Sequence, residues 1–257
     1  MKAVILAGGL GSRLSEETVL VPKPMVQVGG RPILWHIMNI LAAHDVSEFV
    51  VALGYKGEVI KRFFHEYHAF SGDMTVSLRT GETTYQNREV EDWTVHLVET
   101  GPETMTGGRV KRLEKKLAGR RFMVTYGDGV ADVDIGALRA FHESKGVLAT
   151  VTAVQPPGRW GALDVHGDLV THYREKPRGD GAWTNGGFFL LEPEVAGYIE
   201  GDTTTFEEEP LRALAHEGKL ASFRHEGHWQ VMDTLRDKHD LEAAWASGER
   251  PWVTWEP

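Results

Sequence analysis

The sequence predicts an α/β protein in which a single Rossmann-like, doubly wound mixed sheet carries a smaller strand-rich part. Strand-like and helix-like stretches alternate along the first half of the chain, the pattern of an α/β sheet. The run at residues 3–7, AVILA, is continuously apolar, as expected of a parallel strand buried on both faces. After about residue 145 the sequence becomes rich in strand-like segments with glycine turns, and these are expected to complete the same sheet.

The expected elements follow one another in chain order. Residues 31–44 predict a helix because their apolar side chains repeat on one face, and Pro32 suits its first turn. Strands are expected within residues 48–54, 92–100, 121–129, 147–155, 161–177 and 183–193, and helices within 58–70, 106–119, 206–218 and 233–248. The tail, 250–257, is expected to pack on the body or on a neighbouring subunit. No linker or repeat interrupts the chain, so we expect one domain over residues 1–257.

Composition excludes several classes of function. The chain of 257 residues has a formal charge of -9, which disfavours a nucleic-acid groove or an anionic membrane surface as its partner. It has no cysteine, which excludes disulfides, thiolate metal sites and a cysteine nucleophile. No apolar run reaches the roughly 18 residues of a membrane span, and the first apolar run is too short for a secretory signal. We therefore expect a cytoplasmic protein.

The first strand leads into a glycine turn, LAGGLGSRL, at residues 6–14. Bare backbone after a strand favours phosphate binding, because several N–H groups can approach the same anion. The dinucleotide fingerprint fails because Leu14 stands where its third glycine belongs, and the Walker pattern is absent. Arg13 ends the turn, and Lys23 follows between two prolines in PKPM. These two cations favour a polyphosphate ligand.

Four further patterns carry polar residues at expected strand ends. Asp128 lies between glycines after a strand, where α/β ligands gather, although such an aspartate also forms turns. Glu175 and Lys176 precede a proline, as at a solvated strand end. Asn185 precedes two glycines and a strand, as at a hairpin corner. Asp233 precedes the last helix, where it could serve as the N-cap.

Taken together, the segments LAGGLGSRL, PKPM, GDG, EKP, NGGFF and the aspartate of WQVMDT resemble the sugar nucleotidyltransferases over nearly the full length. The segments TGGRVKR and DGAWTNGGFF are similar to the cytidylyl branch of that family. The resemblance implies the nucleotide-diphospho-sugar transferase fold, with a strand-rich sugar-binding part. It also implies transfer of a cytidylyl group from CTP to α-D-glucose 1-phosphate with Mg²⁺, giving CDP-glucose for polysaccharide synthesis.

The resemblance assigns roles residue by residue. It implies a nucleotide-binding half over about residues 1–145 and a sugar-phosphate-binding half over about 146–257. The implied catalytic residues are Arg13, Lys23, Asp128, Lys176 and Asp233, of which Asp128 and Asp233 would hold the metal. The implied nucleotide contacts are Leu6, Ala7, Gly8, Gly9, Leu10, Gly11, Ser12, Arg13, Lys23, Thr104, Thr106 and Arg109. The implied sugar-phosphate contacts are Tyr126, Gly127, Glu175, Lys176, Asn185 and Gly186.

Several alternatives stay open at this point. Thr104, Thr106 and Arg109 could instead cap the following helix. Separately, the acidic run at residues 206–210 is expected to form a first helical turn. The nucleotide could be UTP or dTTP, or the sugar another hexose 1-phosphate. A non-catalytic nucleotide sensor and a dinucleotide-dependent dehydrogenase are the other classes, the latter disfavoured by Leu14. The resemblance also implies a homo-oligomer, with a hexamer as one form.

Overall fold

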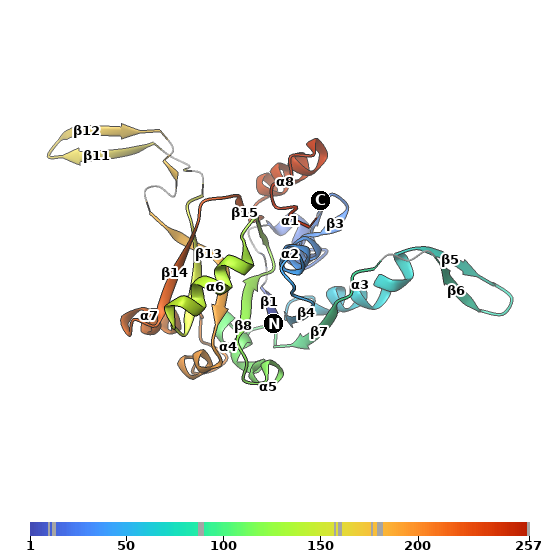
Figure 1. Ribbon diagram of the computed structural model, residues 1–257. Helices are drawn as coiled ribbons and strands as arrows, with labels where there is room; N and C mark the ends of the chain where they lie inside the picture. Colours follow the sequence, from blue (N-terminus) through green and yellow to red (C-terminus); the bar gives the residue numbers. More distant parts are fainter. Residues whose placement is uncertain are drawn as a thin grey trace.

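The computed structural model describes residues 1–9, 11, 14–86, 90–156, 158, 161–175, 177–178 and 182–255. Within these residues, seven strands form a mixed central sheet (Figure 1). Its spatial order is β14 (Leu220–His225), β10 (Ala149–Val154), β13 (Thr184–Leu191), β8 (Phe122–Tyr126), β1 (Lys2–Ala7), β4 (Glu48–Leu53) and β7 (Thr94–Glu99). The expected α/β class with a mixed sheet is thus confirmed.

The remaining elements surround this sheet. Two-stranded ladders are formed by β2 (Gln27–Val28) with β3 (Arg31–Pro32), β5 (Asp73–Val76) with β6 (Thr83–Gln86), β9 (Gly129–Ala131) with β15 (Trp229–Val231), and β11 (Ala162–His166) with β12 (Leu169–Arg174). The helices are α1 (Ser15–Thr18), η2 (Lys23–Met25), α2 (Ile33–Ala42), α3 (Gly57–Phe70), α4 (Thr106–Arg112), α5 (Glu114–Leu117), α6 (Ile135–Lys145), η4 (Pro193–Tyr198), α7 (Glu209–His216) and α8 (Leu235–Ser247). None of the helices in the described ranges is long and apolar enough to cross a membrane.

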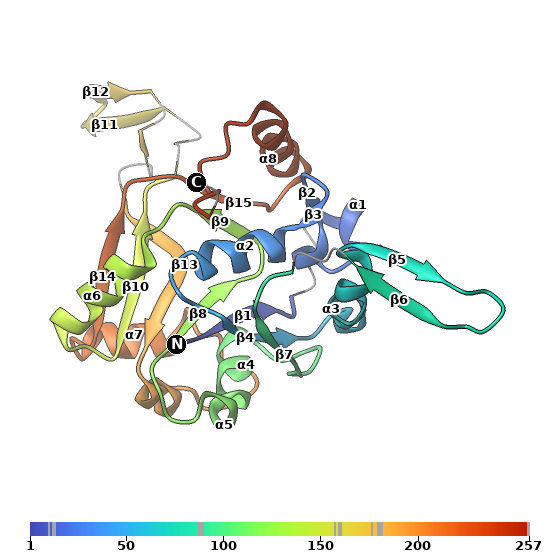
Figure 2. The same cartoon turned by 45° about the vertical axis from the view of Figure 1, so that its right-hand side comes forward.

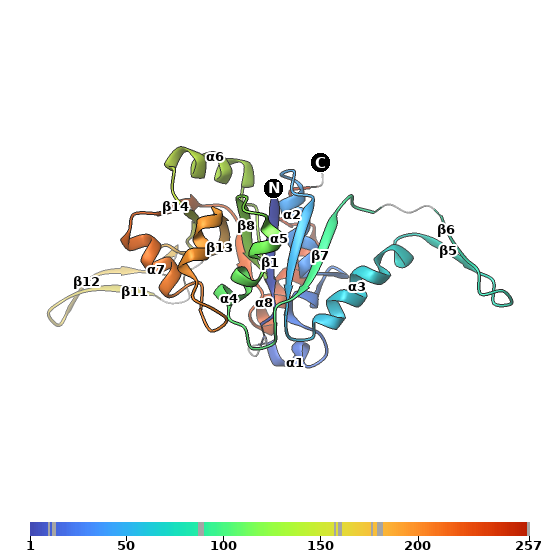
Figure 3. The ribbon, with the colours of Figure 1, turned by 90° about the horizontal axis from the view of Figure 1, so that it is seen from below.

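The central strand β1 explains the layered arrangement. Ala3, Ile5 and Ala7 pack into a core with α2, α6 and α8, whereas Val4 and Leu6 pack into a second core with α4, α5 and α7. Successive side chains of a strand point to opposite faces, so a strand covered on both sides must be apolar throughout. Figures 2 and 3 show the sheet between these two groups of helices.

The strand order reverses direction next to β1. β1 runs parallel to both β4 and β8, and β4 runs parallel to β7, so the carboxyl ends of all four strands share one edge of the sheet. The chain passes from β1 outward to β4 and β7 before it returns to β8 on the other side of β1. Ligands of open α/β sheets bind at the carboxyl edge where the order reverses. The antiparallel strand β13 brings its amino end to this edge.

Two expectations about helices need correction. Residues 106–119 form two short helices, α4 and α5, rather than one. The acidic run at 206–210 is not a first helical turn throughout, because α7 begins only at Glu209. The described part of the tail, residues 250–255, packs on the body: Trp252 is fully buried, and its ring and that of Trp255 lie against His36 of α2.

Candidate active site

The carboxyl ends of β1 and β8 form one wall of a cavity of about 330 Å³. The glycine turn follows β1, and Gly127 follows β8, where its N–H donates to the carbonyl of Leu6 at 3.1 Å. A Cβ on Gly127 would lie 2.8 Å from Cγ of Pro24, so the glycine permits this close approach. The cavity therefore lies at the edge of the sheet where the strand order reverses.

The residues around this cavity come mostly from the expected nucleotide-binding set. It is lined by Leu6, Ala7, Gly8, Gly9, Gly11, Lys23, Thr104, Thr106 and Arg109 from that set, by Tyr126, Gly127 and Asp128, and by Pro24 and Met105, which were not among the expected site residues. The last two could be inferred only from their positions next to Lys23 and Thr104.

A second cavity, of about 310 Å³, adjoins the first. It is lined by the expected residues Tyr126, Asp128, Asn185, Gly186 and Asp233, and by Thr125, Gly129, Gly187, Phe188, Trp229 and Val231. Tyr126 and Asp128 line both cavities, so they form a shared wall. The antiparallel pairing of β13 with β8 explains why Asn185 reaches this place from far along the chain.

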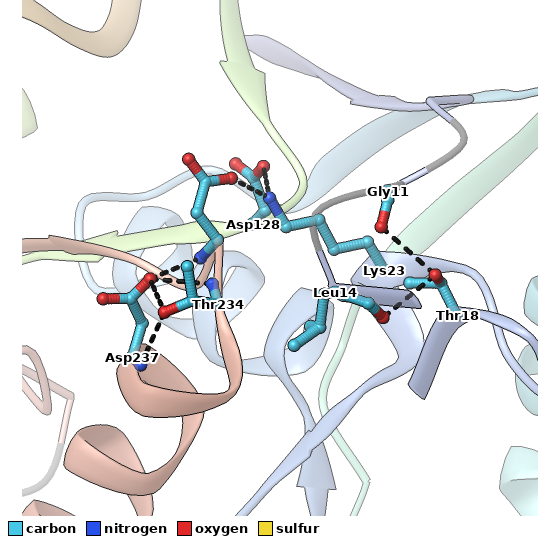
Figure 4. A network of polar contacts seen from close by, with 8 residues as sticks. Gly11, Leu14, Thr18, Lys23, Asp128, Thr234 and Asp237 are labelled. Carbon is cyan, nitrogen blue, oxygen red and sulfur yellow. Dashed lines mark hydrogen bonds and ion pairs between the residues drawn. The ribbon is translucent and has the colours of Figure 1, made fainter. Parts of the chain in front are cut away.

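Lys23 contacts two carboxylates at the junction, the place where the two cavities meet at Asp128. It begins the short helix η2 next to Pro24, and its Nζ donates to Oδ2 of Asp128 at 2.7 Å and to Oδ1 of Asp233. The ladder between β9 and β15 brings the two acids together, because the N–H of Met232 donates to the carbonyl of Asp128 at 2.9 Å. Figure 4 shows Lys23 extended toward Asp128. The Lys23 side chain is 11% exposed, so this ion pair is largely shielded from water.

Asp233 is not the N-cap of the last helix, which corrects one of the sequence interpretations. Thr234 caps α8: its Oγ1 accepts from the N–H of Asp237 at 3.2 Å, and Asp237 accepts in return from the N–H of Thr234 at 2.8 Å. Figure 4 shows this reciprocal pair. Because Thr234 satisfies the helix end, the carboxylate of Asp233 is able to face Lys23.

The guanidinium of Arg109 braces the glycine turn from behind. Arg109 is only 4% exposed and donates to the carbonyls of Gly8 at 3.1 Å, Leu53 at 3.0 Å and Gly101 at 2.8 Å. Gly8 and Gly101 come after the ends of β1 and β7, and Leu53 is the last residue of β4. One side chain therefore connects the carboxyl ends of three strands. Burial, followed by the charge of Arg112, lowers the pKa of Arg109 from its usual value. Arg109 therefore does not cap α4; it braces the turn besides lining the cavity.

Two threonines support the cavity by different routes. Thr106 begins α4 but does not cap it; its Oγ1 donates to Oε2 of Glu207 at 2.5 Å and accepts from the N–H of Phe206 at 2.9 Å. Thr18, which the sequence did not single out, donates from Oγ1 to the carbonyls of Gly11 at 3.1 Å and Leu14 at 3.0 Å (Figure 4). Thr18 thereby holds the backbone of Gly11 and of Leu14 in place.

Some expected site residues are not placed in either cavity. Leu10, Ser12, Arg13 and Lys176 lie outside the described residues. Glu175 is exposed, and its carboxylate accepts a hydrogen bond from the hydroxyl of Tyr173. Among the residues that the structure describes, no three His, Cys, Asp or Glu side chains form a group able to hold a metal ion. A metal here would therefore need ligands beyond two protein carboxylates.

Comparisons with known proteins agree with the sequence motifs. A family model described as nucleotidyl transferase matches residues 2–244. The glucose-1-phosphate cytidylyltransferase of Salmonella typhimurium is 52% identical over 257 residues, which cover 100% of both chains. Among solved structures, HddC from Yersinia pseudotuberculosis has a TM-score of 0.69 at 23% identity, covering 95% of this chain and 99% of that one. UDP-glucose pyrophosphorylase in complex with UDP-glucose has a TM-score of 0.69 at 13% identity, covering 96% and 98%.

The two structural likenesses show the fold, and the family model together with the full-length relative shows the family. The chain belongs to the nucleotidyl transferase family.

Proposed function

We propose that this chain transfers a cytidylyl group from CTP to α-D-glucose 1-phosphate, releasing pyrophosphate and forming CDP-glucose. The observation that carries this choice of substrates is the 52% identity, over the full length, to a glucose-1-phosphate cytidylyltransferase. The two adjoining cavities support the reaction type, because they provide room for two substrates on either side of Asp128.

The first cavity suits the nucleotide. A volume of about 330 Å³ falls within the range of small-molecule sites, and bare glycine backbone forms one wall. Backbone N–H groups of such turns bind phosphate oxygens. As the family resemblance implies, the backbone of Ser12 would continue this wall, and Arg13 would add a guanidinium at the end of the same turn.

The second cavity suits the sugar phosphate. The Trp229 indole donates to the carbonyl of Gly186 at 2.8 Å, which fixes an aromatic wall. Asn185 offers an amide group, and Tyr126 a hydroxyl, at the wall shared with the first cavity. By resemblance, Lys176 would bind the sugar's phosphate and Glu175 its hydroxyls.

Charge is the main obstacle to this reaction. A sugar-phosphate dianion must approach a triphosphate, and each pair of like unit charges 4 Å apart costs about 4 kcal/mol at an effective dielectric near 20. Lys23 lies at the junction and would offset part of this repulsion. An oxygen of the sugar phosphate then bonds to the α-phosphorus of CTP, and the bond from that phosphorus to pyrophosphate breaks in line. Positioning and charge compensation supply the catalysis, with no covalent enzyme intermediate.

The residues at the junction fit Mg²⁺. Asp128 and Asp233 are close enough for a single ammonium to contact both, so their oxygens are able to share one cation. Mg²⁺ prefers one or two carboxylates, with phosphate oxygens and water completing its coordination. When bound, the ion would supply positive charge to the phosphate oxygens. Asp128 and Asp233 would hold it.

Three further expectations belong to this proposal. The chain acts as one domain, with residues up to about 145 serving the nucleotide and those beyond serving the sugar phosphate. It works as a homo-oligomer, of which a hexamer is one form. It acts in the cytoplasm.

A nucleotide panel tests the proposal. Wild-type protein is given glucose 1-phosphate and Mg²⁺ with CTP, UTP, dTTP, ATP or GTP in turn, and pyrophosphate release is measured. CTP should give the highest kcat/KM, and mass spectrometry should identify CDP-glucose. Equal or faster turnover with UTP or dTTP would contradict the cytidylyl assignment, and no turnover with any nucleotide would contradict the activity itself.

A further inference from the structure

Glu207 lies beside the wall between the two cavities, in the acidic segment that precedes α7. Its half-buried carboxylate accepts from the Oη of Tyr126 and, at 2.5 Å, from the Oγ1 of Thr106. Thr106 lines the first cavity and Tyr126 lines both. A single acidic side chain therefore contacts residues from both subsites.

The hydrogen bond to Glu207 determines what Tyr126 is able to do. A phenol has one proton, and here that proton points at a carboxylate, which only accepts. The Nδ2 of Asn185 donates to the same Oη at 3.2 Å. With its proton engaged, Oη is available to further groups only as an acceptor.

The neighbours of Tyr126 hold it in this arrangement. The Oδ1 of Asn185 accepts from the N–H of Gly187 at 2.8 Å, which turns the amide NH₂ toward Tyr126. Gly187 has φ +80, and a Cβ there would lie 2.7 Å from Cδ2 of Tyr126. The ring thus packs directly against backbone, and only a glycine allows both that contact and this φ.

We propose that Glu207 is a positioning residue that fixes the Tyr126 hydroxyl as a hydrogen-bond acceptor toward the second cavity. The cavity then selects a hexose 1-phosphate that presents a hydroxyl donor at that point, and disfavours one in which the hydroxyl is replaced or blocked. This inference rests on the proposed function, since it names the chemistry by which the sugar subsite recognises its substrate.

Fluorinated substrates test the proposal. Each of four glucose 1-phosphate analogues carries fluorine in place of the hydroxyl at position 2, 3, 4 or 6. Fluorine keeps nearly the size of the hydroxyl but has no proton to donate. With wild-type protein, kcat/KM should fall about 10-fold or more at one position, because a hydrogen bond to the protein is lost.

Protein variants then assign that loss to Tyr126 and Glu207. Tyr126→Phe should reduce the penalty at the sensitive position to within about 2-fold, since no acceptor remains. Glu207→Ala should reduce it likewise, because the released phenol proton is able to donate toward the substrate. Glu207→Gln keeps an acceptor for Tyr126 and should keep most of the penalty. The exposed neighbour Glu208 provides the matched control, and Glu208→Gln should behave as wild type.

The readout is the ratio of the kcat/KM values of two substrates, glucose 1-phosphate and its fluorinated analogue, on the same enzyme. Partial loss of folded protein therefore does not alter it. A penalty that is equal in wild type and Glu207→Ala, or no penalty at any position in wild type, would overturn the role of Glu207. In either case wild-type protein would still make CDP-glucose. Failure to make CDP-glucose would instead overturn the proposed function.

Discussion

Replacing Asp128 with asparagine removes one negative charge at the junction and leaves the local shape almost unchanged. The backbone carbonyl of residue 128 still accepts from Met232, so the ladder between β9 and β15 is preserved. Lys23 keeps Asp233 as a partner, so no buried ammonium is left alone. The Asp128 side chain is 25% exposed, so water is able to solvate the asparagine amide that replaces it. The variant should therefore fold normally.

The effect on catalysis should be much larger. Lys23 and Asp128 lie 2.7 Å apart in a largely shielded site, where charges interact several times more strongly than in water. Removing one preorganised electrostatic group from an active site typically costs about 3–4 kcal/mol of transition-state stabilisation. We therefore expect kcat to fall about 100-fold or more in Asp128→Asn.

The assay measures pyrophosphate release at saturating CTP and glucose 1-phosphate while Mg²⁺ is titrated. Urea unfolding of the same preparation checks the fold. Asp240 of α8 is exposed and offers the same change of charge away from the cavities, so Asp240→Asn serves as the control. Turnover of Asp128→Asn within about 3-fold of wild type at saturating Mg²⁺ would refute the reasoning.

Three further outcomes follow from other parts of the molecule. A Cβ on Gly8 would lie 2.2 Å from the guanidinium of Arg109, whereas one on Gly9 meets nothing within 4 Å. Gly8→Ala should therefore lower the free energy of unfolding by about 1–3 kcal/mol and weaken CTP binding. Equal stability of Gly8→Ala and Gly9→Ala would contradict this. Burial lowers the pKa of His36 to about 4, below its unfolded value of 6.5, so the unfolded chain binds more protons between these pH values. The free energy of unfolding, measured in urea, should therefore fall by about 3 kcal/mol as the pH drops from 6.5 to 4. An imidazole NMR signal of His36 that titrates near 6.5 would refute this. Lys176→Ala should raise KM for glucose 1-phosphate far more than the Kd for CTP, and a loss confined to CTP affinity in calorimetry would count against its role.

The parts of the site that the sequence predicted are local in the chain. The glycine turn and the GDG segment each follow a buried strand directly, so their place at the carboxyl edge follows from the strand pattern. Lys23 and Asp233 come from distant segments, and in the sequence only the resemblance to the family links them. The structure shows that the ladder between β9 and β15 brings Asp233 next to Asp128, and that Lys23 donates to both.

The features that the sequence did not predict depend on contacts between distant residues. Glu207 bonds to residues 81 and 101 positions away, and nothing in its own segment distinguishes it from an acidic helix start. Arg109 lines the first cavity, but nothing in the sequence indicated that its guanidinium also donates to backbone carbonyls of three segments. The strands of the hairpin β5 and β6 are exposed along their whole length. Met74 and Val76 alternate with polar residues, but no expected element was assigned to this stretch.

The central claim is that the two substrates react directly with each other at the place where the two cavities meet, beside Tyr126 and Asp128. The stereochemistry at the α-phosphorus tests this claim most directly. CTP carrying sulfur in place of one non-bridging α-oxygen, as a single diastereomer, is converted with glucose 1-phosphate, and the product's configuration is determined by ³¹P NMR. Direct attack predicts inversion at phosphorus. Retention would show two successive displacements through a covalent cytidylyl-enzyme, and would contradict the account.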